Sequence, residues 1–251
     1  MNNLNDFFAE NPRLAIAFSG GVDSAYLLHE ALEHCEQVRA YYVSSPFQPK
    51  FEQDDAERLA MGMHADLRIL PIDVLSEPCI AENPPDRCYH CKKRIFTEMI
   101  NAAREDGFFV LADGTNDSDD EELRPGMRAL AELSVRSPLR ECGLTKREIR
   151  KRSRDAGIFT WDKPAYACLA TRIPTGEAVT AEKLRISEEA EQYLFSMGFR
   201  DFRIRMCRDA AKIQMPESQL TRLLTHREEI LTTLKKYYPV VTLDLEVRNE
   251  Q

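Results

Sequence analysis

A glycine-rich string, Ser19–Ser24 with the sequence Ser-Gly-Gly-Val-Asp-Ser, is the clearest chemical signal in the chain. It follows the apolar run Leu14–Phe18 and precedes a segment with apolar residues at helical spacing. A strand, a glycine-rich turn and a helix start place backbone N–H groups and the positive end of a helix around one anion. No Gly-Lys-Ser or Gly-Lys-Thr follows, so this is not the usual mononucleotide loop, whose lysine reaches the β- and γ-phosphates. We predict a phosphate-binding loop.

A second polar turn, Gly114-Thr115-Asn116-Asp117-Ser118-Asp119-Asp120, follows another apolar run. Carboxylate oxygens at the end of a strand suit Mg²⁺, a hard cation that prefers oxygen ligands. Asp119 and Asp120 are the candidate ligands. A solvated acidic loop would have the same composition, and the choice of carboxylate stays open.

Three of the seven cysteines could bind or deliver an atom. Cys88-Tyr89-His90-Cys91 is a C-x-x-C directly before a helical pattern, and this spacing serves zinc, a redox dithiol or an iron–sulfur cluster. The chain has no second C-x-x-C and no H-x-x-H, which argues against a structural zinc site. Cys168 lies in an alanine-rich segment, where a lone cysteine is most often a small core residue.

Short apolar runs alternate with helical patterns in the first half of the chain, as in a parallel sheet covered by helices. The predicted strands are Arg13–Phe18, Gln37–Val43, Asp66–Ile72 and Gly107–Ala112. The predicted helices cover 22–32, 54–63, 92–103, 126–133 and 145–156. The last of these opens on Thr145, with Glu148 three residues later, a capping box. We predict an α/β fold with a doubly wound parallel sheet, whose ligands bind at the carboxyl ends of the strands.

The pattern changes after Trp161–Pro164. Beyond this point the sequence predicts a small α+β unit: a helix over 181–197, strands over 202–206 and 211–215, a helix over 217–237 and a last strand over 240–247. The dipeptide Arg208-Asp209 between the first two strands indicates a hairpin. We therefore expect two domains, 1–164 for nucleotide binding and 165–251 for substrate binding.

Composition narrows the class of protein further. The chain has 251 residues, and 34 basic against 42 acidic side chains give a net charge of −8. This acidity argues against an extended nucleic-acid surface, which needs a basic face. No apolar run is long enough to cross a bilayer, and the odd number of cysteines does not suggest a disulfide framework. We expect a cytoplasmic protein that works on a small molecule without membrane attachment.

The Ser19–Ser24 string resembles the pyrophosphate-binding loop of the N-type ATP pyrophosphatases, the PP-loop proteins with an adenine nucleotide alpha hydrolase-like fold. Members of this superfamily cleave ATP between the α- and β-phosphates and activate a carboxylate or carbonyl oxygen by adenylylation. The resemblance implies that Ser19, Gly20, Gly21, Val22, Asp23 and Ser24 bind ATP. It implies the same of Gly114 and Thr115.

Further strings extend the resemblance over nearly the whole chain: Arg124–Ala129, Ser137–Leu139 and above all Leu144–Pro174. Together they resemble the LarE family, ATP-dependent pyridinium-3,5-biscarboxylic acid mononucleotide sulfurtransferases of nickel-pincer nucleotide cofactor biosynthesis, which serves lactate racemase. In one branch of the family a cysteine at the position of Cys168 gives up its own sulfur. In another branch three cysteines hold a [4Fe-4S] cluster, and Cys88, Cys91 and Cys168 match that branch. The sequence leaves open which of the two supplies the sulfur.

The same resemblance implies a phosphate-bearing substrate with carboxylates. It assigns Arg203 and Arg205, which alternate along a predicted strand and so share a face, to the substrate phosphate. It also places Glu191 in the site. An external sulfide donor and a homo-oligomer are implied as partners.

Other functions remain open. A tRNA thiolase of the same superfamily can pair this ATP loop with three cysteines, and the basic segment 146–154 could hold RNA, although we favour a solvated helix face for it. An amidating synthetase would need an ammonia source. From another class, a non-catalytic nucleotide- or metal-binding module would use its cysteines for zinc.

Overall fold

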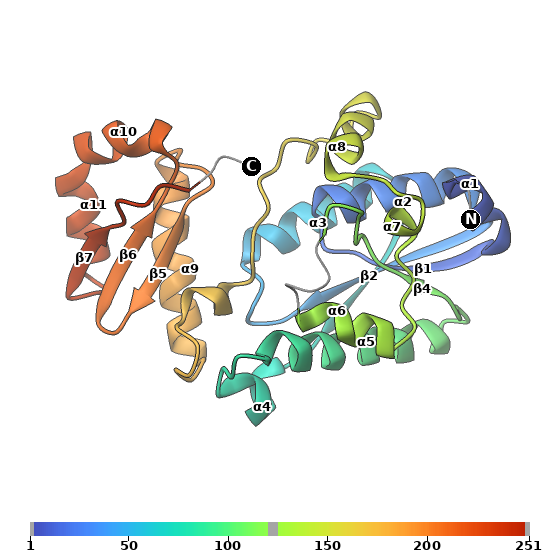
Figure 1. Cartoon of the computed structure of the whole chain (residues 1–251), viewed down its shortest axis with the longest axis horizontal. Coiled ribbons are helices and arrows are strands. Elements are labelled where there is room, and N and C mark those ends of the chain that lie inside the picture. Colours follow the sequence, from blue (N-terminus) through green and yellow to red (C-terminus); the bar gives the residue numbers. More distant parts are fainter. Residues whose placement is uncertain (1–2, 120–124, 249–251) are drawn as a thin grey trace. The chain divides into compact units, whose positions relative to one another are not determined.

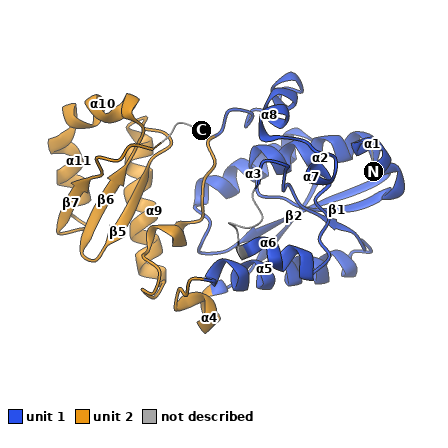
Figure 2. Cartoon of the chain, viewed as in Figure 1, with its two compact units in different colours: residues 1–74, 86–163 blue, residues 75–85, 164–251 orange. Residues whose placement is uncertain are grey.

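The chain forms two compact units in a computed structural model that describes residues 3–119 and 125–248 (Figure 2). The first unit consists of residues 1–74 and 86–163, and the second of residues 75–85 and 164–251. The segment 75–85, which the sequence analysis assigned to the first domain, therefore packs with the second unit.

A four-stranded parallel sheet is the centre of the first unit (Figure 1). Its strands are β1 (Arg13–Ala17), β2 (Gln37–Ser44), β3 (Asp66–Pro71) and β4 (Leu111–Ala112), in the order β3-β2-β1-β4. Helices α2 (Val22–His34) and α3 (Lys50–Gly62) lie on one face, and α5 (Arg87–Glu105) and α6 (Pro125–Glu132) on the other. The predicted doubly wound α/β fold is confirmed.

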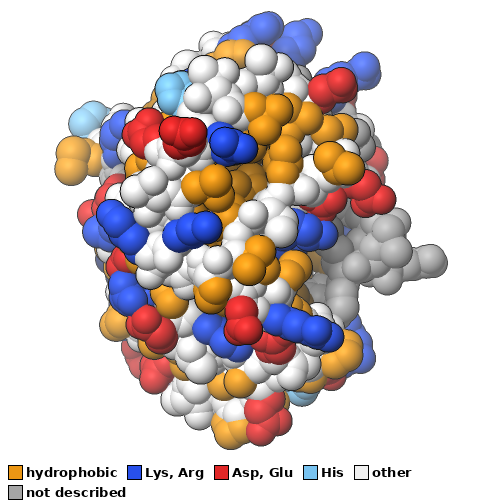
Figure 3. Space-filling model, turned by 90° about the vertical axis from the view of Figure 1, so that its left-hand side faces the viewer, with side chains coloured by type: hydrophobic (Ala, Val, Ile, Leu, Met, Phe, Trp, Pro, Cys, Tyr) orange, Lys and Arg blue, Asp and Glu red, His pale blue; other side chains and the backbone are white. Residues whose placement is uncertain are grey.

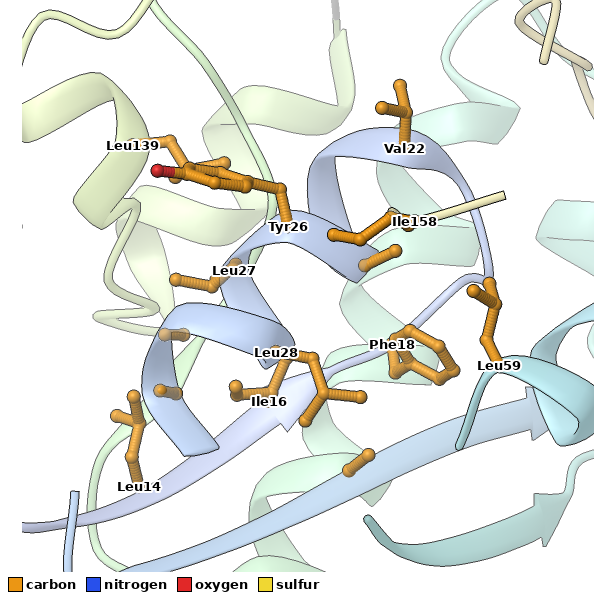
Figure 4. Close-up of a cluster of buried hydrophobic side chains, with 14 of the residues drawn as sticks. Leu14, Ile16, Phe18, Val22, Tyr26, Leu27, Leu28, Leu59, Leu139 and Ile158 are labelled. Carbon is orange, nitrogen blue, oxygen red and sulfur yellow. The ribbon is translucent and has the colours of Figure 1, made fainter. Parts of the chain in front are cut away.

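The buried core of this unit lies between the sheet and α2 (Figure 4). Leu14 and Ile16 of β1 face Leu27 and Leu28 of α2, and each of these four side chains is fully buried. Burial of such aliphatic side chains stabilises the fold by roughly 1.5–3 kcal/mol each. The loop that follows β1 is thus fixed between two elements that cannot shift independently.

On the other face of the sheet, an ionic cluster joins the end of α5 to the strands. Asp106, which follows α5, accepts hydrogen bonds from Arg68 at 2.8 Å and from Tyr41 at 2.8 Å, and it pairs with Arg39 at 2.9 Å. The hydrogen bond from Arg68, with those from Tyr41 and Arg39, lowers the pKa of Asp106 to about 2.

Four further helices are short or lie outside the sheet layers: α1 (Leu4–Glu10), α7 (Pro138–Glu141) and α8 (Lys146–Asp155) in the first unit and α4 (Pro78–Ala81) in the second. Of these, the sequence predicted α8 alone, and its capping box is confirmed: the Thr145 hydroxyl accepts from the backbone of Glu148, whose carboxylate accepts from the backbone of Thr145. The short helices α4 and α7 have too few turns to show a periodic pattern.

The second unit contains a three-stranded sheet of β5 (Arg203–Cys207), β6 (Ala210–Gln214) and β7 (Val240–Leu243), in that order. The predicted hairpin is confirmed, because β5 and β6 are antiparallel and Cys207 is opposite Ala210. Helix α9 (Ala181–Ser196) precedes the sheet, and α10 (Leu220–Thr225) and α11 (Arg227–Leu234) join β6 to β7.

Three predicted elements differ from the structure. Strand β4 has two residues in place of the predicted run 107–112, because Gly107 turns the chain at a φ of +82° and Phe109 is 82% exposed. The predicted helix over 217–237 is interrupted at His226, which ends α10 and caps α11. The last strand ends at Leu243, where the Asp244 carboxylate turns the chain by accepting from the backbone of Glu246.

In the described part of the chain, no helix combines the length and apolar character that crossing a membrane requires.

Candidate functional site

Two loops meet at the point where the strand order of the first sheet reverses. After β1 the chain proceeds outward through β2 and β3, then returns to place β4 on the other side of β1, with Ile16 opposite Ala112. The loops after β1 and β4 therefore leave the sheet side by side. In open α/β sheets, ligands bind at this position.

The first loop is the predicted phosphate loop, and its shape depends on its glycines. Gly20 has a φ of +72°, and a Cβ there would lie 3.0 Å from the Cβ of Ala56. Gly21 caps α2 without a side-chain hydrogen bond. The first N–H groups of a helix have no carbonyl partner within it, so the N–H groups at the start of α2 face the loop. The hydroxyls of Ser19 and Ser24 lie 3.1 Å apart and brace the loop. This geometry suits an anion.

The second loop touches the first at Gly114. A Cβ on Gly114 would lie 2.7 Å from the backbone nitrogen of Ser24, closer than real Cβ contacts. Thr115 is buried, and its hydroxyl donates to the Asp113 carboxylate at 2.5 Å. Ser137 donates to the same carboxylate at 2.7 Å. The residues predicted to bind nucleotide thus come together in one place, and their role in binding it stays a prediction.

The carboxylates predicted to bind Mg²⁺ are only partly described. The Asp119 carboxylate accepts a hydrogen bond from the backbone N–H of Asn116 at 3.1 Å and so shapes its own loop. Asp120 lies outside the described residues. Within residues 3–119 and 125–248, no three histidine, cysteine or acidic side chains are grouped to hold a metal ion.

The sequence analysis missed a lysine at the phosphate loop. Lys146, the first residue of α8, forms an ion pair with Asp23 at 2.5 Å, across 123 positions of the sequence. The other carboxylate oxygen of Asp23 is buried and has no hydrogen-bond partner among the described residues. Burial raises the pKa of Asp23, and Lys146 opposes that rise. The ammonium of Lys146 therefore supplies a positive charge to a loop that lacks its own lysine.

Cys88 and Cys91 lie within the first two turns of α5 in the first unit. Their spacing of three places them on one side of the helix, one turn apart. Cys88 is exposed and Cys91 is half-buried, and neither forms a disulfide. Arg87, which is buried, directs its guanidinium to the Cys88 sulfur at 3.6 Å. Two adjacent, accessible thiols beside a cation can bind a metal centre as thiolates.

Cys168 belongs to the second unit, where it is half-buried and precedes the short 3-10 helix Leu169–Arg172. Arg172 donates to the carbonyls of Ala167 at 2.7 Å and Cys168 at 3.3 Å, and to the Thr171 hydroxyl at 2.8 Å. The same guanidinium forms two hydrogen bonds to Glu191, at 2.9 and 2.8 Å. The backbone around Cys168 is therefore fixed by one buried arginine.

Glu191 and Arg172 form a buried ion pair, with side chains 1% and 0% exposed. Glu191 also accepts from the backbone of Ile204 at 2.8 Å and from the Tyr166 hydroxyl. The guanidinium of Arg172 lies 4.5 Å from the centre of the Tyr166 ring. Glu191, predicted to line the substrate site, is in this structure the anchor of Arg172.

Arg203 and Arg205 support the same segment. Arg203, 5% exposed, donates to the carbonyls of Ala165 and Phe202, each at 2.6 Å. Arg205 donates to the carbonyl of Thr171 at 2.7 Å. Together with Arg172, they form what we call the arginine frame of Cys168. Their predicted role in binding the substrate phosphate stays a prediction.

The arginine frame has an excess of positive charge. Burial, together with the nearby charges of Arg172 and Arg248, lowers the pKa of Arg203 to about 10. The same causes lower the pKa of Arg205. Cations that are destabilised by burial and by one another would be stabilised by an added anion.

The fold and the two loops define a doubly wound α/β protein of the PP-loop type with a smaller C-terminal sheet. No family model matches the chain. A pyridinium-3,5-bisthiocarboxylic acid mononucleotide synthase of Lactiplantibacillus plantarum is 32% identical over 236 residues, covering 93% of this chain and 86% of the relative. An uncharacterized protein of Synechocystis is 35% identical over 251 residues, covering 98% and 93%. One of Methanocaldococcus jannaschii is 30% identical over 247 residues, covering 98% and 94%. The chain belongs to the family of the Lactiplantibacillus synthase, the LarE family.

Proposed function

We propose that the chain is an ATP-dependent sulfurtransferase that converts a carboxylate of pyridinium-3,5-biscarboxylic acid mononucleotide into a thiocarboxylate, for nickel-pincer nucleotide cofactor synthesis. The observation that supports this most is the similarity to a named synthase of this chemistry over 93% of the chain. A match of that extent includes both units, so it is not a likeness of the nucleotide-binding fold alone.

Activation of the carboxylate is assigned to the first unit. The loop Ser19–Ser24 and Lys146 bind the β- and γ-phosphates, with Mg²⁺ held by carboxylates that include Asp119. A substrate carboxylate oxygen attacks the α-phosphorus of ATP, the bond between that phosphorus and the bridging oxygen breaks, and pyrophosphate leaves. The resulting acyl-adenylate has AMP as its leaving group, which a free carboxylate lacks. Sulfur then bonds to the acyl carbon and AMP departs.

The sulfur is assigned to the three cysteines Cys88, Cys91 and Cys168. None of the three forms a disulfide; Cys88 is exposed, and Cys91 and Cys168 are half-buried. Cys88, Cys91 and Cys168 would hold a [4Fe-4S] cluster through their thiolates, and a cluster held in this way would supply a replaceable sulfide. With Cys168 as the donor instead, each chain would complete one turnover. We favour the cluster, because it is the alternative that uses all three cysteines.

The substrate phosphate is assigned to the arginine frame. Burial, and after it the neighbouring cations Arg172 and Arg248, lower the pKa values of Arg203 and Arg205. A phosphate that approached them would relieve this excess charge.

The structure does not favour a tRNA thiolase. In the basic helix α8, Lys146 binds Asp23, Arg150 donates to the carbonyls of Trp161 and Lys163, and Arg152 contacts Tyr26. On the face shown in Figure 3, Lys and Arg are interspersed with Asp, Glu and hydrophobic side chains. That face has no continuous basic surface of the kind that RNA binding requires.

Anaerobic purification tests the cluster. Iron and sulfide analysis and an optical spectrum would be recorded for the wild type and for Cys88→Ala, Cys91→Ala and Cys168→Ala. Cys79→Ala is the matched control, because Cys79 is exposed and only nine positions before Cys88. We expect iron in the wild type and the control, with loss in the three variants. A wild type that binds no iron after reconstitution rejects the cluster.

Turnover separates the remaining alternatives. We expect pyrophosphate release that depends on the carboxylate substrate, and a thiocarboxylate product. Mass spectrometry of the protein after turnover distinguishes the two sulfur sources, since sacrifice of Cys168 would leave dehydroalanine at that position. If no pyrophosphate is released, with or without the carboxylate substrate, the result favours a non-catalytic nucleotide-binding module.

A further inference from the structure

Helix α6 packs along α5 in the first unit (Figure 1). It includes residues 125–129 of the string Arg124–Ala129, which contributes to the family resemblance and has no part in the proposed reaction. Side chains of α6 bind the first two turns of α5, where Cys88 and Cys91 lie. The position of these two thiols therefore depends on α6 as well as on α5.

The first turn of α5 has no side-chain cap in the described structure. Asp86 is the N-cap residue, but its carboxylate accepts no hydrogen bond from the described backbone of that turn. It lies instead 3.1 Å from the ring of His90. The first N–H groups of a helix have no carbonyl partner within it, so an uncapped first turn opens more readily than the turns that follow. Cys88 belongs to this turn, and Cys91 begins the next.

Glu132 of α6 binds the two residues of α5 that lie two positions before and two positions after Cys91. The Tyr89 hydroxyl donates to the Glu132 carboxylate at 2.7 Å, and the Lys93 ammonium donates to the same oxygen at 2.9 Å. Lys93 also donates to the Tyr89 hydroxyl at 3.0 Å. Hydrogen bonds to an ionised acceptor are stronger than those between neutral groups. Because Tyr89 and Lys93 are four residues apart, these bonds span the first two turns.

Arg128 of α6 contacts the same tyrosine from its ring. The guanidinium lies 3.7 Å from the centre of the Tyr89 ring, and it pairs with Glu132 at 3.6 Å. Tyr89 is 9% exposed. A cation over an aromatic ring is attracted to it, more so where water is excluded. We call Tyr89, Lys93, Arg128 and Glu132 the α6 clamp.

Gly126 permits the close approach of the two helices. A Cβ at this position would lie 2.5 Å from the Cδ of Lys92, within the side chain that follows Cys91. The start of α6 therefore packs against the stem of Lys92, beside the C-x-x-C.

We propose that the α6 clamp holds the first two turns of α5 in place and so keeps the Cys88 and Cys91 thiols at a separation that suits one metal centre, with Arg128 and Glu132 as positioning residues. Side chains three positions apart on a helix have Cβ atoms about 5–6 Å apart, near enough for both sulfurs to bind one ion. This assignment rests on the proposed function, which gives these thiols to a cluster. All four residues of the clamp belong to the first unit, and their effect on the thiols is measurable without iron, ATP or substrate.

Cadmium binding to the reduced, iron-free, full-length protein tests the clamp. The background replaces the three cysteines of the second unit by serine. These are Cys79, Cys168 and Cys207. The ultraviolet charge-transfer band of thiolate-bound Cd²⁺ reports binding. Each affinity is measured with both thiols of the C-x-x-C and again with Cys91→Ala. The ratio of the two affinities is the advantage of chelation, which depends on how well the second thiolate is held near the first.

Glu132→Ala and Arg128→Ala are the informative variants. Glu98→Ala is the matched control, because Glu98 lies on α5, pairs with Arg94 at 3.3 Å and has a side chain 37% exposed, against 40% for Glu132. We expect the advantage of chelation to fall about fivefold in each informative variant and to stay unchanged in the control. The affinity of the Cys91→Ala proteins should be the same throughout, since one thiolate needs no partner.

Hydrogen exchange measured by mass spectrometry locates the change along α5. In Glu132→Ala, the amides of residues 89–94 should exchange several times faster than in the parent, whereas those of residues 98–104 should be unchanged. A general loss of stability would accelerate both segments.

An unchanged advantage of chelation in either informative variant would overturn the proposal. Equal acceleration of exchange in both segments of α5 would do the same, as would a parent whose Cd²⁺ affinity is not weakened by Cys91→Ala. The iron content of the wild type is measured separately. A protein that binds no iron but gives the expected cadmium results would reject the cluster and retain the clamp.

Discussion

Replacing Arg172 by methionine should destabilise the second unit and loosen the backbone that holds Cys168. Methionine has a similar length and fills much of the same volume, so the change mainly removes the guanidinium. The variant loses two hydrogen bonds to Glu191 and those to the Ala167 carbonyl, the Cys168 carbonyl and the Thr171 hydroxyl. It leaves a carboxylate that is 1% exposed without its cation.

Removal of one partner of a buried ion pair costs about 3–5 kcal/mol, because the remaining charge is desolvated and unpaired. We expect Arg172→Met to lower the free energy of unfolding by about 4 kcal/mol. Adding Glu191→Gln to Arg172→Met removes the unpaired carboxylate charge and keeps an oxygen that can accept from the Ile204 N–H. The double variant should therefore lose about 2 kcal/mol less than the sum of the two single variants.

Urea unfolding followed by circular dichroism measures these differences. Arg185→Met is the control: Arg185 pairs with Glu182 and Glu189 on the surface of α9, with 52% of its side chain exposed, and should cost less than about 1 kcal/mol. In native conditions, a monofunctional maleimide should label Cys168 several times faster in Arg172→Met than in the wild type or the control.

The reasoning fails if Arg172→Met costs no more than Arg185→Met, because the pair would then contribute no more than a surface one. It also fails if Cys168 is labelled at the wild-type rate. The arginine frame would in that case be part of the core of the second unit without positioning the cysteine.

Three other changes test the first unit. Lys146→Met should weaken ATP binding about tenfold, because it removes a cation from the phosphate loop. Lys151→Met, an exposed change on the same helix, should leave ATP binding unaltered. Equal affinities in calorimetry would argue against a role of Lys146 in binding ATP. Gly114→Ala should reduce ATP affinity at least tenfold, because its Cβ would lie 2.7 Å from backbone, and Gly62→Ala, with open space around it, is the control. The pKa of Asp106 is about 2 in the folded state against an ordinary 3.8, so its ionised carboxylate stabilises the fold above about pH 4, and this contribution is lost as the pH falls toward 2. In urea unfolding at several pH values, Asp106→Asn should remove about 1 kcal/mol of this pH-dependent stability. An unchanged dependence of the free energy of unfolding on pH would contradict this.

Local signals predicted much of the fold. The capping box at Thr145 and Glu148 and the turn at Arg208-Asp209 act through residues that are neighbours in sequence, and both form as expected. The strand that ends at Ala112 was predicted too long, because apolar character continues past the point where the backbone pairs with β1. Exposure of Phe109 could not be inferred from its type.

The candidate site was predictable only in part. The two loops were found because each has a glycine pattern at a strand end. The lysine that pairs with the first loop was not found, because Lys146 reaches Asp23 across 123 positions. Nor was the role of Arg172 beside Cys168, because no sequence feature distinguishes it from a surface arginine. Burial of a charged residue depends on tertiary contacts, and a single sequence does not show them.

The discontinuous second unit determines an order of assembly during synthesis. Residues 75–85 leave the ribosome long before residues 164–251, so they must wait while the whole of 86–163 is made. The first unit can close its sheet in that interval, because β1 to β4 all precede residue 113. A nascent chain that stops at residue 163 would contain the segment 75–85, with its apolar Ile80, but none of residues 164–251, the rest of its unit. The last third of the polypeptide thus completes a surface begun in the first third.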